Sequence, residues 1–78
     1  MSRILGVLGG MGPAATVDFL AKLQAATPAA RDQDHIRVLV DLNPQVPDRN
    51  VDAGAAEAEL SRMAAGLKAA GAQVLAMP

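Results

Sequence analysis

Three short apolar runs alternate along the chain with two segments of helical periodicity. The runs span residues 4–8, 36–42 and 72–77, and their sequences are ILGVL, IRVLVDL and AQVLAM. Short runs of this kind are typical of strands that are covered on both faces of a sheet. Because strands that alternate with helices pair in parallel through right-handed crossovers, the order predicts an α/β fold, β-α-β-α-β, with helices flanking a parallel sheet.

The two helical segments have recognisable ends. Pro13 suits the first turn of a helix, where a missing N–H is no loss, and Pro28 ends the segment. Asp18 and Lys22 are spaced to pair on the outer side. Gly71 is suited to end the second helix with a positive φ. The apolar stripes that define the two helices are Thr16, Phe19, Leu20, Leu23 and Ala26 in the first, and Ala56, Leu60, Met63, Ala64 and Leu67 in the second.

Composition excludes several classes of function. The chain has 78 residues, which is enough for one small domain of marginal stability. A net charge of −1 and a single aromatic residue, Phe19, argue against a nucleic-acid or membrane-surface partner. The absence of cysteine and the presence of a single histidine, His35, exclude a thiolate or multi-histidine metal site. No apolar run approaches the ~20 residues of a membrane helix, so we expect a soluble cytoplasmic protein.

The residues suited to chemistry are concentrated in the loops that follow the predicted strands. Parallel sheets bind ligands outside the carboxyl ends of their strands. The first such loop, residues 9–13, contains Gly10, Met11 and Gly12 ahead of the Pro13 helix. Glycines let a ligand approach the backbone, and the unpaired N–H groups of a helix N-terminus favour an anion such as a phosphate or a carboxylate. The alternative is a tight strand-to-helix turn that binds nothing.

The loop after the second strand, NPQVPDR at residues 43–49, is the second candidate. Arg49 offers a planar fork for a carboxylate, while Asn43 and Gln45 add amide groups. The alternative is a solvated turn in which Arg49 pairs with a neighbouring aspartate. His35 precedes the second strand, so we expect it at the opposite edge of the sheet, in a turn or capping role.

A dinucleotide site is a competing interpretation. Gly10, Gly12 and Ala15 fit the fingerprint G-x-G-x-x-A, and Asp41 near the end of the second strand could contact a ribose. Asp41 lies rather far along the chain for that role, and a proline follows the second glycine. A phosphate-binding P-loop fits less well, because no Gly-Lys-Ser/Thr follows the glycines.

The chain resembles the aspartate/glutamate racemase family, and most of all the aspartate racemases that use no pyridoxal phosphate. The matching segments are ILGVLGGMGPAAT at the start, TPAARDQDH after the first helix, NPQVPDR after the second strand and GAQVLAMP at the end. They cover nearly the whole chain, while residues 50–59 fit less well and suggest a shorter loop. NPQVPDR favours acidic amino acids over the other substrates of this scaffold.

The resemblance implies a fold of two similar α/β halves with the active site between them. It implies that two cysteines, one from each half, exchange protons on opposite faces of the substrate α-carbon, with no cofactor and no metal. It further implies that Arg49 helps hold the substrate's side-chain carboxylate. Met11 with the backbone of Gly10 and Gly12, together with Gln45 and Asn43, is implied to line the site.

This chain departs from the family pattern because it contains no cysteine, so both catalytic thiols are absent. In the family the first catalytic cysteine directly follows the segment that corresponds to Met77 and Pro78. We therefore expect residues 1–78 to be a partial α/β domain, the first part of a racemase that forms a homodimer at full length. By itself this chain is expected neither to racemise aspartate nor to fold robustly. A non-catalytic module that binds a carboxylate or assembles with another chain is the remaining alternative.

Overall fold

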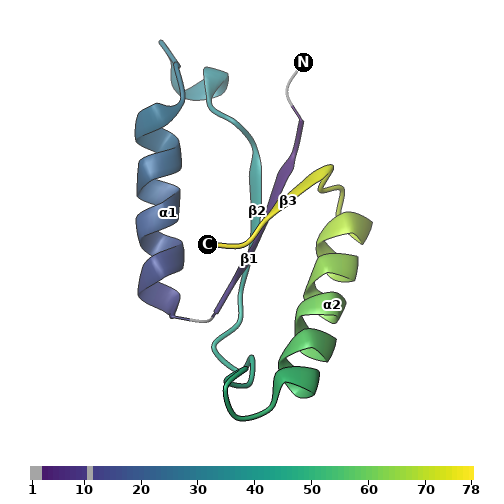
Figure 1. The fold of residues 1–78 in the computed structure, drawn as a ribbon. Helices are drawn as coiled ribbons and strands as arrows, with labels where there is room; N and C mark the ends of the chain where they lie inside the picture. The colour runs from purple at the N-terminus through teal and green to yellow at the C-terminus, as the bar shows by residue number, and fades with distance from the viewer. Residues whose placement is uncertain (1–2, 11) are drawn as a thin grey trace.

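The computed structural model describes residues 3–10 and 12–78, and its elements follow the predicted order (Figure 1). Two α-helices and a short 3-10 turn connect three strands. The elements are β1 (Leu5–Gly9), α1 (Pro13–Ala26), η1 (Asp32–Asp34), β2 (Val38–Leu42), α2 (Ala53–Ala69) and β3 (Val74–Ala76).

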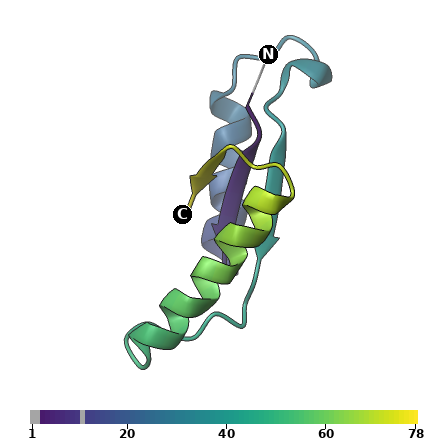
Figure 2. The same cartoon turned by 90° about the vertical axis from the view of Figure 1, so that its right-hand side faces the viewer.

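The three strands form one parallel sheet with the order β2-β1-β3. Leu5 pairs with Val38 on one side and with Val74 on the other. Figures 1 and 2 show α1 and α2 on opposite faces of this sheet, so the chain forms three layers. The predicted β-α-β-α-β fold with a parallel sheet is therefore confirmed.

The main core lies between the sheet and α2. Its buried residues come from the middle strand, the loop after β2, the helix and the segment before β3, and they are Leu8, Val46, Ala56, Met63, Leu67 and Ala72. The helical members belong to the predicted stripe of α2. Leu39 of β2 packs against the same cluster. This face of the sheet therefore anchors both the helix and the loop that leads into it.

The opposite face is covered more sparsely by α1. Val7 of β1 and Thr16 of α1 are its fully buried side chains. Thr16 approaches so closely that a Cβ at Gly9 would lie 2.7 Å from its methyl carbon, so the end of β1 accepts no side chain there. Phe19 and Leu20, in contrast, remain only half-buried. The predicted pair of Asp18 and Lys22 forms at 2.8 Å on the outer side.

Helix α2 has well-defined caps at both ends. At the start, Asp52 Oδ1 accepts a hydrogen bond from the N–H of Ala55 at 2.9 Å, which satisfies one of the free donors of the first turn. At the end, Gly71 adopts φ 116°, and its N–H and that of Ala72 donate to the carbonyls of Lys68 and Leu67. This pair of bonds is a Schellman motif, as the glycine predicted.

The two outer strands are shorter than their apolar runs suggest. Strand β2 pairs with all five residues of β1 and begins at Val38 rather than residue 36, opposite Leu5. Strand β3 covers Val74–Ala76 only and pairs with Leu5–Val7. Apolar side chains on these strands stay partly exposed, including Val40 and Leu42 at 40% each. Among the described residues, no helix has the length and apolar character needed to cross a membrane.

Candidate functional site

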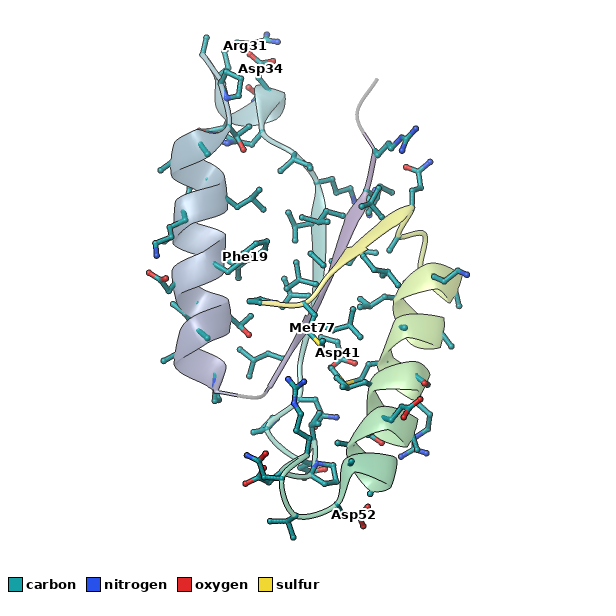
Figure 3. The ribbon with its side chains drawn as sticks, in the orientation of Figure 1. Phe19, Arg31, Asp34, Asp41, Asp52 and Met77 are labelled. Atoms are coloured by element: carbon teal, nitrogen blue, oxygen red, sulfur yellow. The ribbon has the colours of Figure 1, made fainter. Side chains whose placement is uncertain are left out.

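The carboxyl ends of all three strands lie at one edge of the sheet, because the strands are parallel. The loops after β1 and β2 and the residues after β3 therefore begin at the same edge. Figure 3 shows the side chains of Asp41 and Asp52, which bracket the loop after β2, and that of Met77, which follows β3. The loops in which the sequence analysis predicted a site therefore begin close to one another.

The loops after β1 and β2 touch through their backbones. The N–H of Asn43 donates to the carbonyl of Gly9 at 2.8 Å, which extends the strand pairing by one step. Gly10 has φ 141°, and a Cβ at this position would overlap the Asn43 carbonyl group, whose carbon would lie 2.6 Å away. The structure therefore brings together two of the predicted site residues, Gly10 and Asn43, and only glycine fits between them.

The side chain of Asn43 binds within the protein. Its Nδ2 donates to Oε2 of Glu59 at 2.8 Å and lies 3.6 Å from the sulfur of Met63. Its Oδ1 accepts from the N–H of Gln45 at 3.0 Å. Asn43 thus ties the loop after β2 to helix α2 through its Nδ2, while its Oδ1 closes a turn within the loop.

The rest of this loop is held by one apolar anchor and by local hydrogen bonds. Val46 is buried in the α2 core, so the loop folds back against the helix. Asp48 Oδ1 accepts from the N–H of Asn50 at 2.8 Å, and the Asp48 carbonyl accepts from Asp52 at 2.9 Å. Gln45 is exposed beside the anchor. The loop is therefore a fixed platform, with the Gln45 side chain on its outer surface.

Arg49 lies in an apolar groove of about 530 Å³ that runs between α2 and β3. The groove reaches Leu8 at the end of β1 and Met77 after β3, so Arg49 lies near the carboxyl ends of both strands. Glu57 is the other charged residue of the wall. The full lining is Leu8, Arg49, Ala53, Ala56, Glu57, Leu60, Ser61, Ala64, Leu75, Ala76 and Met77. A cationic side chain beside apolar walls is an arrangement that can hold a carboxylate.

The glycine loop presents the start of α1 at the same edge. Gly12 is exposed, has φ 94° and precedes Pro13, the first residue of the helix. Its carbonyl accepts from Ala15 at 3.0 Å, and no side chain caps the helix. Met11, which the sequence placed in the site, lies outside the described residues. The uncapped start of α1 is compatible with an anion site there.

Glu59 is a residue of this region that the sequence did not single out. It lies off the apolar stripe of α2, yet it accepts hydrogen bonds from Asn43 and from Arg62, whose Nε is 2.9 Å from Oε1. These Arg62 bonds hold the pKa of Glu59 below its ordinary value, while partial burial raises it. The charge of Arg62 and the Asn43 bond lower the pKa further. The spacing of three residues between Glu59 and Arg62 on one helix is the sequence signal that could have indicated this pair.

A group whose pKa is lowered on folding stabilises the fold above its unfolded-state pKa, and this contribution disappears as the pH falls through the folded-state value. We therefore expect Glu59→Gln to lower the urea midpoint of unfolding at pH 7, and to have no such effect at a pH low enough to protonate Glu59 in both the folded and the unfolded state. The control is Glu57→Gln, an exposed change on the same helix. If Glu59→Gln lowers the urea midpoint equally at pH 7 and at the low pH, ionisation of Glu59 is not the cause.

His35 lies at the opposite edge of the sheet, as its sequence position predicts. It directly follows η1, and its N–H donates to the Asp32 carbonyl at 3.2 Å. It also lines a separate hollow of about 400 Å³ between α1 and the start of β2. No set of three metal-ligating side chains comes together in residues 3–10 and 12–78.

Two comparisons with known proteins agree with this geometry. The family model described as Asp/Glu/Hydantoin racemase matches residues 8–78. The solved structure of Picrophilus torridus aspartate racemase superposes with a TM-score of 0.87 at 32% sequence identity. The match covers 99% of this chain and 55% of that chain, so the chain spans about half the length of its solved relative. The chain belongs to the Asp/Glu/hydantoin racemase family.

Proposed function

We propose that this chain forms one wall of the substrate site of an amino-acid racemase that acts on aspartate or glutamate. The single observation that carries the proposal is the position of Arg49, in a groove that also reaches the carboxyl ends of β1 and β3. A guanidinium there can bind the side-chain carboxylate of an acidic amino acid through two parallel hydrogen bonds. The exposed Gln45 and the start of α1 are the further groups at this edge.

The proposed chemistry moves a proton at the α-carbon of the bound amino acid. Such a reaction needs a base on one face, an acid on the other and stabilisation of the charge that develops. Residues 1–78 contain no cysteine, so this chain supplies no thiol for either proton transfer. Its own contribution is to bind and orient the substrate, through Arg49 and the glycine loop.

Titration of the labelled chain with L- and D-aspartate, followed by NMR, tests this role. We expect saturable binding that Arg49→Ala weakens by about 10- to 100-fold, because a charged, bidentate contact is lost. Arg49→Lys should be intermediate, since it keeps the charge without the fork. Arg31→Ala is the matched control, because Arg31 pairs with Asp34 at the opposite end of the molecule (Figure 3).

Two further measurements on the same samples test the proposed role: binding of asparagine, and deuterium exchange at the α-carbon of aspartate. Asparagine should bind more weakly than aspartate, because it lacks the carboxylate that Arg49 is proposed to hold. No deuterium should enter the α-position of aspartate from heavy water, because the chain carries no thiol base. Binding that Arg49→Ala leaves unchanged would overturn the proposed role of Arg49.

A further inference from the structure

The hollow of about 400 Å³ between α1 and the start of β2 is separate from the groove that holds Arg49. It lies at the end of the sheet where η1 leads into β2. Figure 3 shows Arg31 and Asp34 at this end of the molecule and Asp52, where α2 begins, at the other. Sites for small molecules commonly have volumes of about 300–1,000 Å³. The hollow is therefore large enough for a small ligand of its own.

The hollow exists because the packing of α1 on the sheet loosens along the helix. Thr16, in the first turn, is fully buried, whereas Leu20 and Leu23, one and two turns later, are only half-buried. These two leucines form the helix side of the hollow, and Val38 at the start of β2 forms its sheet side. Apolar walls of this kind favour a ligand with a hydrocarbon part, because both surfaces leave water when it binds.

Three polar side chains share this apolar hollow. Gln24 comes from α1, Asp32 begins η1, and His35 directly follows η1. Within residues 3–10 and 12–78, none of the three side chains makes a hydrogen bond or an ion pair. His35 is half-buried, while Gln24 and Asp32 are exposed. A few unpartnered polar groups that converge on apolar walls are the usual composition of a ligand site.

The charge of the lining selects the kind of polar group that a ligand would carry. Asp32 is negative, and the nearby Asp34 already pairs with Arg31 at 3.0 Å, so Asp32 is the carboxylate left for a ligand. A ligand carboxylate would meet it as a like charge. An ammonium group, in contrast, has three N–H donors and no acceptor, and Asp32, the Gln24 amide oxygen and a neutral His35 ring each offer an acceptor.

We propose that this hollow binds a small primary amine with a hydrocarbon body. The ammonium group is held by Asp32, and the hydrocarbon lies between the two leucines of α1 and Val38 of β2. Such a ligand contacts α1 and β2 together, so its binding should also stabilise the sparsely packed face of the sheet. The site shares no lining residue with the groove of Arg49, so the inference is independent of the proposed racemase activity.

Titration of the labelled full chain with 2-phenylethylamine, followed by NMR, tests the proposed site. We expect saturable shifts of the methyl signals of Leu20, Leu23 and Val38. 2-Phenylethanol has a similar shape without the charge, and 3-phenylpropanoate has the opposite charge. Both should bind at least about tenfold more weakly, because neither forms a charged hydrogen bond with Asp32. The amine should also raise the urea midpoint of unfolding as its occupancy rises.

Two substitutions test the polar contacts. Asp32→Asn should weaken binding of the amine by about tenfold or more. Asp34→Asn is the matched control, because it makes the same charge change two residues away and Asp34 does not line the hollow. Gln24→Ala should weaken binding by about three- to tenfold, and it is an exposed change on α1 to a residue that favours helices. The amide spectrum of each variant shows that it remains folded.

Three results would each overturn the proposal. They are the absence of saturable binding by 2-phenylethylamine, equal binding of the amine and the alcohol, and equal losses of affinity in Asp32→Asn and Asp34→Asn. Arg49→Ala should leave amine binding unchanged, because Arg49 lines the other groove. The outcome for the amine can therefore be told apart from the outcome for aspartate.

Discussion

Replacing Gly10 with alanine is expected to lower the free energy of unfolding by about 3 kcal/mol or more. The new Cβ would overlap the backbone carbonyl of Asn43, and a backbone group cannot move aside as a flexible side chain can. The φ of 141° adds strain for any residue with a side chain. The substitution should therefore separate the loops after β1 and β2 and break the bond from Asn43 to Gly9.

The matched control is Gly66→Ala in α2. Gly66 is exposed, has a negative φ, and a Cβ there would meet no atom within 4 Å other than the helix's own backbone. Alanine favours a helix over glycine by about 1 kcal/mol, so this change should raise the midpoint of urea unfolding. Both midpoints are measured in sulfate, which strengthens apolar burial and widens the folded range of a small chain. Equal effects of the two substitutions would contradict the proposed contact at Gly10.

The fold could be predicted because its signals are local. Pro13, Asp52 and Gly71 mark helix ends through their own backbone and side-chain chemistry, and the apolar runs mark strands. The ends of β2 and β3 could not be predicted in this way. They depend on which residues find a partner on β1, which is a property of the assembled sheet rather than of either run.

The edge of the sheet at which the candidate site lies could be predicted from the sequence. The contacts that individual residues make there could not be predicted as well. Parallel strands fix the edge at which Gly10, Asn43 and Arg49 lie, whatever the details of the loops. The partners of Asn43 were not predictable, because they depend on which turn of α2 packs beneath the loop. Glu59 was missed for the same reason, since its contact with Asn43 joins residues 16 positions apart.

The loop and the core meet at Met63, so this residue links stability to the site. Met63 is 4% exposed between α2 and the sheet, and its sulfur lies 3.6 Å from Nδ2 of Asn43. Met63→Ala should lower the free energy of unfolding by about 2–5 kcal/mol, because it removes buried apolar contacts and leaves a cavity. The urea midpoint and the amide exchange rates of residues 43–49 are the measurements.

Met63→Leu separates the packing of this side chain from its sulfur contact. Leucine nearly conserves the volume, so the expected loss of stability is below about 1.5 kcal/mol. Asn43 keeps its hydrogen bond to Glu59 in this variant, so the loop should stay protected from exchange. In Met63→Ala, the cavity lies beneath the loop. The amide exchange rates of residues 43–49 should therefore increase more than those of α1. If both variants destabilise equally, the sulfur contact rather than packing holds the loop, because only that contact is lost in both.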